Sequence, residues 1–548
     1  MPQGTEITRF SGLPLASVVL LAVVSACTSS CSSTSSPLNP ANTLTLAIGA
    51  EPPDLNATKA TDSESFFILG HVMEGLTRAG NDGKPAPGVA ESWKLSDSGA
   101  TFKIRPTARW SDGKPVTAHD FVYAWRTVVD PKNASEYGFI LGPIKNAEKI
   151  LAKKLPAESL GVKATDDRTL EVEFEKPCGY FLALTSFATY FPVREDFHRS
   201  LGERYGAEAQ NLLYNGPFML TQWVHGASLR LQKNPQYWNA STIALDAIDI
   251  PYITPDDSSR FNLFKDGKID LVHLSKNTLQ TAMRERFRMR KFVDGTVFYL
   301  EFNFREGRIL RNKNLRKAIQ AVFDPEEYTD KVVSIPGTLA GTTLIPSWIA
   351  GKKGLFRQDY PFVRPKPDLR AAKAYLQAAL KELQLQSPPP IVWLTGDSPG
   401  SSKEAEYFQN LLKSTLGIEL KIDKQIFKQR LAKMSSGDFD IVSAGWGPDY
   451  NDPMTFADLK TSWNENNRGR WSHPRYDALI RQAQATTRPE VRMDAMAEAE
   501  RLLLDELPIL PLYERSVVYT QSPRLSHVVR RSVGFDPDYT EARLAPKP

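Results

Sequence analysis

Residues 439–453 (FDIVSAGWGPDYNDP) hold the side chains best suited to binding a small charged molecule. The first five are β-rich and predict a short strand that runs out into a loop, because glycine and proline follow. Gly445 and Gly447 would let a ligand approach the main chain closely, while Trp446 offers a flat apolar wall and Asp449 a carboxylate. The stretch predicts a receptor for a small cationic group beside extended backbone. The alternative is a structural turn, with the tryptophan in the core and the aspartate capping the next segment.

Residue patterns typical of catalysis are missing from the sequence. The seven histidines are isolated, and no pair has the spacing of a metal site. No Walker, His-Glu-x-x-His or Gly-x-Ser-x-Gly pattern occurs. We therefore expect a binding protein without catalytic residues, metal or cofactor, and a hydrolase would need a polar triad that the sequence does not offer.

Alternating strands and helices must position the 439–453 stretch. Strands are predicted over residues 391–395, 418–422 and 439–443, with helices over 401–416 and 427–434 between them. This order predicts a parallel sheet with right-handed crossovers. Ligand crevices form at the carboxyl ends of such strands, which is where Trp446 and Asp449 follow.

Length and composition fit a large globular protein. At 548 residues the chain is too long for one hydrophobic core and predicts two or three domains. Its 41% hydrophobic and 24% charged residues are ordinary for a globular protein. The net charge of +5 is small and no dense lysine or arginine run occurs, so we expect no nucleic-acid binding.

The amino-terminal residues predict export and anchoring. Residues 13–24 (LPLASVVLLAVV) have the length of a signal-peptide apolar region and are too short to span a bilayer. Val24-Ser-Ala-Cys27 looks like a bacterial lipobox, so residues 1–27 are predicted as a lipoprotein signal peptide with Cys27 lipidated. The alternative is a cleaved secretory signal without lipid. Residues 28–41 are rich in Ser and Thr and predict a flexible tether.

Several further blocks occur in the order that one protein family shows. They are residues 83–93 (GKPAPGVAESW), 110–125 (WSDGKPVTAHDFVYAW), 215–218 (NGPF) and 234–238 (NPQYW). Together with residues 439–453, they make nearly the whole chain after residue 41 similar to bacterial periplasmic oligopeptide-binding proteins, the solute-binding family 5 components of ABC peptide importers.

This resemblance implies an α/β, two-lobed periplasmic binding protein of type II (cluster C), with mixed sheets and an extra small α+β domain. The boundaries we expect are 42–75, 193–293 and 512–548 for a discontinuous lobe I, 76–192 for the extra domain, and 294–511 for lobe II. The predicted strand 296–304 crosses between the lobes and would serve as a hinge.

The resemblance also implies a monomeric extracytoplasmic receptor that closes over an oligopeptide and delivers it to ABC permease subunits. It would be held at the membrane by its lipid, in the periplasm or at the cell surface. Relatives on the same frame bind other solutes, so a metal chelate, haem or a cell-wall peptide stays open as ligand. A surface adhesin or chaperone is a more distant alternative.

The resemblance assigns Asp449 to the ligand's α-ammonium group. Thr61, Asp62, Ser63 and Glu64 are second-choice contacts, because the family's corresponding loop and helix start face the ligand. Asp62 has an alternative role as a helix cap.

One departure concerns the ligand's carboxyl end. Ser443 stands where the family has an arginine that can meet a short peptide's carboxylate. The expected histidine near residues 396–404 is missing, although Lys403 is close. We therefore expect longer or non-tripeptide ligands.

Overall fold

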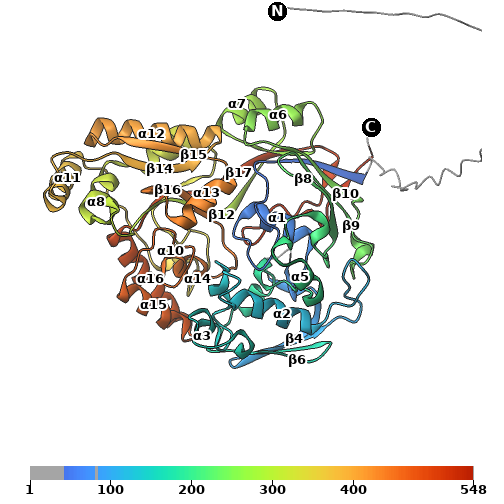
Figure 1. The fold of residues 1–548 in the computed structure, drawn as a ribbon. Coiled ribbons are helices and arrows are strands. Elements are labelled where there is room, and N and C mark those ends of the chain that lie inside the picture. The colour runs from blue at the N-terminus through green and yellow to red at the C-terminus, as the bar shows by residue number, and fades with distance from the viewer. Residues whose placement is uncertain (1–41, 81–83, 547–548) are drawn as a thin grey trace, which may run out of the picture. The chain divides into compact units, whose positions relative to one another are not determined.

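Three larger β-sheets organise the described residues (Figure 1). The structure is a computed structural model that describes residues 42–80 and 84–546. Its largest sheet has seven strands, in the order β11 (Leu271–Leu274), β17 (Ile509–Gln521), β12 (Met289–Phe302), β16 (Ile441–Trp446), β14 (Ile391–Gly396) and β15 (Leu420–Gln425), with β13 (Leu339–Ala340) beside β17.

The seven-stranded sheet is mixed. β14 runs parallel to both β15 and β16, as the alternation of strands and helices predicts. The connecting helices α12 (Pro399–Leu416) and α13 (Phe427–Ser436) pack on these strands. β12 is antiparallel to both β16 and β17, so the parallel part of the sheet joins an antiparallel part.

A second sheet contains the first described strand. Its order is β1 (Thr43–Ile48), β10 (Ala247–Ile253), β9 (Ser228–Lys233) and β8 (Phe218–Val224). Alternate residues of β1 are buried, the pattern of a strand with one face in the core. Helix α1 (Ser63–Val72) packs on β8.

The third sheet is antiparallel and lies within residues 90–173. Its order is β4 (Ala90–Ser96), β5 (Gly99–Ile104), β7 (Thr169–Glu173) and β6 (Val162–Asp166). Helix α2 (Ala118–Val129) packs on β6 and β7 and buries Trp125 completely.

The remaining elements are short strands and the other helices. They are β2 (Thr77–Ala79), β3 (Pro85–Pro87), β18 (Leu525–Ser526), β19 (Arg543–Leu544), α3 (Ala147–Leu151), α4 (Phe181–Leu184), α5 (Glu195–Leu201), α6 (Asp257–Lys265), α7 (Lys276–Arg284), α8 (Lys313–Val322), α9 (Pro325–Tyr328), α10 (Phe356–Asp359), α11 (Leu369–Leu383), α14 (Met454–Ala457), α15 (Pro474–Gln484) and α16 (Pro489–Glu506).

Helix α8 illustrates how the local sequence determines where a helix begins and which of its faces is buried. Asn312 caps it, since its side chain accepts a hydrogen bond from the Leu315 amide at 2.9 Å. Leu315, Ile319 and Val322 recur at helical spacing and are buried. They pack this helix against α11, beside α12 (Figure 1).

The predicted strand end at Ser443 is wrong. β16 continues to Trp446, because β12 pairs with it as far as Val297 opposite that tryptophan. β12 is also longer than predicted: it begins at Met289 and has 14 residues. Residues 509–521 form the 13-residue strand β17, to which β12 pairs. Cross-strand pairing decides these ends, and local sequence does not contain it.

The predicted signal peptide (1–27), its lipidation residue Cys27 and the tether (28–41) lie outside the described residues. Within residues 42–80 and 84–546, no helix is both long enough and apolar enough to cross a membrane. The boundaries expected for lobe I, the extra domain and lobe II stay predictions.

Candidate functional site

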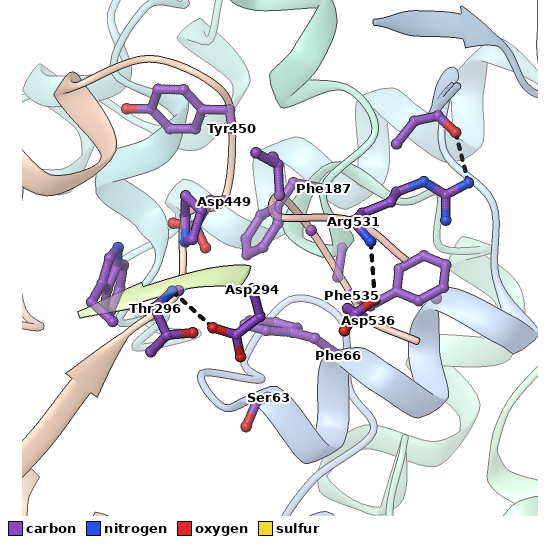
Figure 2. A pocket seen from close by; sticks show the side chains of 18 of the residues that line it. Ser63, Phe66, Phe187, Asp294, Thr296, Asp449, Tyr450, Arg531, Phe535 and Asp536 are labelled. Atoms are coloured by element: carbon purple, nitrogen blue, oxygen red, sulfur yellow. Dashed lines mark hydrogen bonds between the residues drawn. The ribbon is translucent and has the colours of Figure 1, made fainter. Parts of the chain in front are cut away.

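A cavity of about 740 Å³ lies among segments that are far apart in sequence. Its wall includes the start of α1, the β12 strand, helix α13, the end of β16 with the loop after it, and residues 530–536. Figure 2 shows Phe66, Phe187, Asp294 and Asp449 around this space. Three predicted parts of the chain, lobe I, the extra domain and lobe II, therefore contribute to one wall.

Most of the site residues expected from the sequence line the cavity. Those in its wall are Thr61, Asp62, Ser63, Ser443, Gly445, Trp446, Gly447 and Asp449. Glu64 is not among the residues that line it. Burial and the nearby Asp62 carboxylate raise the pKa of Glu64 to about 7.

Asp449 is a buried carboxylate whose negative charge has no cation beside it. Its side chain is 8% exposed and accepts one long hydrogen bond, 3.4 Å from the Tyr137 hydroxyl. It forms no ion pair with any described residue. Burial raises the pKa of Asp449 well above its usual range, and the Asp458 carboxylate adds to this effect. The neighbouring Asp452 differs, since Arg492 donates to both its oxygens at 2.8 Å.

The Asp449 backbone is fixed locally. Its amide donates to the Thr455 hydroxyl at 3.1 Å, which holds the loop between β16 and α14. The carboxylate is thus positioned before any ligand arrives. A buried charge is costly without a partner, so the site is suited to a cation from the cavity.

Trp446 forms a flat wall next to this carboxylate. Its indole lies parallel to the Tyr137 ring, and its Nε1 is buried without an acceptor among the described residues. An indole N–H donates only, so it could donate to a carbonyl oxygen of a ligand. Figure 2 also places Tyr450 beside Asp449; its ring stacks on Tyr180 at 4.9 Å between centroids.

The main chain next to Trp446 has a free edge. β14 pairs only with Ile441 and Val442 of β16, so the same edge of residues 443–446 lacks a strand partner among the described residues. Gly445 is a close-packing position: an added Cβ would lie 3.0 Å from the Phe298 ring. At Gly447 an added Cβ would meet only the Thr296 hydroxyl, at 3.5 Å, so close packing does not require a glycine there.

Asp62 performs its alternative role as a helix cap. It accepts hydrogen bonds from the Ser65 amide at 2.9 Å and the Ser65 hydroxyl at 2.7 Å. Burial raises the pKa of Asp62 to about 6. The same side chain lines the cavity, between Thr61 and the exposed Ser63.

Ser443 points its hydroxyl to another acid. The hydroxyl donates to Glu404, whose other oxygen accepts from the Tyr328 hydroxyl at 2.5 Å. Lys403 does not line the cavity; it donates to the Asn277 side chain at 3.3 Å. The lysine that the sequence placed near the carboxyl end therefore lies elsewhere.

The sequence did not single out several residues of the wall. Tyr137 and Arg430 come from helical or turn segments with no motif around them. Residues 532–535 belong to the carboxyl-terminal segment, where Gly534 donates to the Pro448 carbonyl at 3.1 Å. Only the folded structure brings these residues together in the cavity wall. Within the described residues no cluster of three or more His, Cys, Asp or Glu is arranged to hold a metal ion.

Comparisons with known proteins agree with this architecture. The oligopeptide-binding protein OppA of Bacillus subtilis is 32% identical over 506 residues, which cover 90% of this chain and 91% of that protein. The dipeptide-binding protein DppE of the same organism is 31% identical, covering 88% and 89%. The structure of Listeria monocytogenes OppA bound to peptide has 32% identity and a TM-score of 0.88, covering 93% and 100%.

A family profile matches as well. The profile of bacterial extracellular solute-binding proteins, family 5 (Middle), matches residues 84–468, well over half of the chain. Members of this kind bind solutes and are not enzymes, which agrees with the missing catalytic patterns. The chain therefore belongs to the bacterial extracellular solute-binding proteins of family 5.

Proposed function

We propose that this protein is the extracytoplasmic receptor of an ABC importer, which binds oligopeptides in the cavity and delivers them to the permease. The observation that carries the proposal is Asp449, a buried carboxylate without a cation in the wall of a cavity. The printed names of the similar proteins, an oligopeptide-binding and a dipeptide-binding protein, support a peptide as the ligand class.

The ligand's α-ammonium group pairs with Asp449. A free amino end brings a positive charge that is costly to bury without a negative partner, and the buried Asp449 carboxylate is costly without a positive one. A hydrogen bond between charged groups contributes about 1.5 to 3 kcal/mol net. Trp446 covers one side of the amino end and excludes water from the pair.

The ligand's main chain adds to the free edge of residues 443–446. Hydrogen bonds to an extended peptide supply affinity that does not depend on side chains. Three residue steps of a strand span roughly 10 Å, so the edge pairs with several residues of the ligand. This length favours an oligopeptide over a dipeptide.

The ligand's side chains meet an aromatic part of the wall. Phe66 packs edge-on against Phe187 at 4.8 Å and against Tyr137 at 5.6 Å. Such surfaces accept apolar side chains of different shapes through dispersion contacts. Asp62 remains a secondary contact candidate because it lines the cavity wall. Glu64 does not line the cavity, so it would act on the ligand only electrostatically, from a distance.

Closure involves the two long strands β12 and β17. They pair along most of their length, with a register shift between Val293 and Val297, where Gly295 has a φ of 81°. An interruption of this kind is a suitable place for bending between the proposed lobes I and II. Ligand contacts from both sides shift the population to the closed form.

Cys27 anchors the receptor through lipid, and residues 28–41 tether it. The lipobox-like Val24-Ser-Ala-Cys27 supports this part of the proposal. A second candidate ligand is a cell-wall peptide, which would use the same Asp449 pairing if it has a free amino end. A chelate or haem fits the cavity less well, because neither needs a buried carboxylate for an ammonium group.

Native mass spectrometry of the purified protein tests the proposal. We expect added masses that gentle activation releases as peptides, and calorimetric binding of free-amino peptides after they are removed. A haem or metal chelate in their place, with no binding of any peptide from a mixed-length set, would contradict the proposal.

A further inference from the structure

The cavity wall contains a positive charge that the ammonium site does not use, that of Arg430. It lies on helix α13, partly buried, and its Nη1 donates to the Ser443 carbonyl at 3.2 Å. Its guanidinium also lies 5.4 Å from the centroid of the Phe427 ring. These two contacts hold the head of the side chain in the wall.

Protein groups leave this guanidinium incompletely satisfied. Its Nε is buried without an acceptor among the described residues, and the side chain forms no ion pair with any of them. Burial lowers the pKa of Arg430, which is the direction expected for a cation without a close countercharge.

Two acids, Glu404 and Asp397, act on this guanidinium from a distance, and neither forms an ion pair with it among the described residues. Glu404 already accepts hydrogen bonds from Ser443 and Tyr328, and burial raises the pKa of Glu404 above its ordinary value. Arg430 therefore lacks in the empty cavity the partner that a buried cation needs.

Most other arginines of the wall are paired. The ion pairs are Arg468 with Glu136, Arg515 with Asp294, Arg530 with Asp536, and Arg531 with Asp538. Arg78 is the exception: it lines the cavity, its Nε lacks an acceptor, and it forms no ion pair with the described residues. It provides a matched comparison for Arg430.

The two arginines differ in place. Arg78 lies on β2, next to Glu74, whose carboxylate accepts from Tyr237 and Trp238. Arg430 is bonded to the carbonyl of Ser443, three residues before Trp446 on β16 and thus roughly 10 Å along the free strand edge. A ligand bound on that edge therefore passes Arg430.

We propose that Arg430 is an anion subsite that binds a carboxylate of the bound peptide, a few residues from its amino end. A guanidinium matches a carboxylate in shape and charge and forms strong hydrogen bonds with it. The carboxylate is that of an Asp or Glu side chain of the peptide. This inference rests on the proposed peptide function and adds a charge preference to it.

Calorimetry with a peptide series tests it. The reference probe is a neutral pentapeptide with a free amino end and an amidated carboxyl end. A second set replaces one residue at a time by Asp, and a third shortens the chain and frees its carboxyl end. Each is measured with the unaltered protein, Arg430→Gln and Arg78→Gln.

We expect at least one carboxylate-bearing peptide to bind the unaltered protein about 10- to 100-fold more tightly than the reference. Arg430→Gln removes that difference: the carboxylate-bearing peptides lose far more affinity than the reference, whose continued binding also shows that the variant is folded. Arg78→Gln keeps the difference. The Asp peptides are expected to carry this gain, and a gain confined to the shortened free-acid peptides would contradict the side-chain assignment.

Three further results would overturn the inference. One is that no carboxylate improves binding to the unaltered protein; another is that Arg430→Gln weakens the reference and the acidic peptides equally, as a structural role predicts. The third is that Arg78→Gln, and not Arg430→Gln, removes the difference. If the reference itself does not bind the unaltered protein, the proposed peptide function fails first, and the subsite fails with it.

Discussion

The ring of Tyr137 lies parallel to the indole of Trp446, with centroids 5.8 Å apart and an angle of 12° between the planes. The Tyr137 hydroxyl also donates to Asp449, 312 positions away in the sequence. The predicted extra domain, 76–192, thereby contributes directly to the proposed ammonium site.

Substitution of Tyr137 separates these two contacts. Tyr137→Ala removes the stack and opens the buried wall, so we expect all peptides to bind about 10-fold more weakly or worse. Tyr137→Phe keeps the stack and loses only a 3.4 Å hydrogen bond, so its affinity should change little. Calorimetry with one free-amino peptide checks both. A Tyr137→Phe loss as large as that of Tyr137→Ala would show that the hydroxyl matters more than the ring.

Asp449→Asn should discriminate between amino ends. It removes the charge that pairs with an ammonium group, and we expect about 10- to 100-fold weaker binding of a free-amino peptide. The N-acetylated form of the same peptide should lose far less. Equal losses for both peptides would refute the ammonium role.

The same variant should stabilise the ligand-free protein. A carboxyl group whose pKa is raised by folding contributes stability at low pH that is lost as pH rises through the raised value. Asn carries no charge at any pH, so Asp449→Asn should have the higher Tm near neutral pH, and the difference should shrink on acidification. Thermal unfolding at several pH values checks this.

Binding of a free-amino peptide should depend on pH in a defined direction. Burial and Asp458 raise the pKa of Asp449 in the empty site, and an ammonium ion beside it lowers that pKa again. Binding therefore releases protons, and affinity falls as pH decreases through the raised value, by at most about tenfold per pH unit. Calorimetry in buffers of different ionisation enthalpy measures the released protons. Asp449→Asn is the control, because it should release fewer.

A buried ion pair that includes the cavity-lining Glu301 should matter for stability. Lys460 Nζ lies 2.7 Å from a Glu301 oxygen, with side chains 0% and 2% exposed. Lys460→Met leaves Glu301 buried without its cation and should lower the free energy of unfolding by about 3 to 5 kcal/mol. Adding Glu301→Gln to Lys460→Met should restore part of the lost free energy of unfolding. Urea unfolding of the ligand-free proteins measures both, and a Lys460→Met cost below about 1 kcal/mol would contradict a tightly coupled pair.

Cys27→Ser tests the anchor. Without a thiol the residue cannot be lipidated, so we expect the protein in the soluble fraction of an osmotic or wash extract, while the unaltered protein needs detergent. Cys31→Ser is the matched control and should not change the partition. Extraction of Cys27→Ser only by detergent would count against a lipid at this position.

Local sequence predicted the central features of the site and missed its surroundings. A parallel strand and the loop at its carboxyl end can be recognised from a few residues. This pattern pointed to Asp449 and Trp446, and both lie in the cavity wall. The strand end at Ser443 was wrong, since pairing with β12 extends β16 to Trp446. Tyr137 could not be found, because nothing in its own segment indicates that it meets Asp449, 312 positions away. Arg430 lies on a predicted helix, but the sequence does not indicate that its side chain faces the cavity.

The free edge of β16 also affects how the empty protein behaves in a crowded compartment. Unpaired strand edges are where folded proteins recruit one another into fibres and other unwanted assemblies. Here residues 443, 444 and 446 are buried and only Gly445 is exposed, so little of the edge is offered to a neighbouring sheet. Burial of this edge thus limits self-association of the unloaded protein.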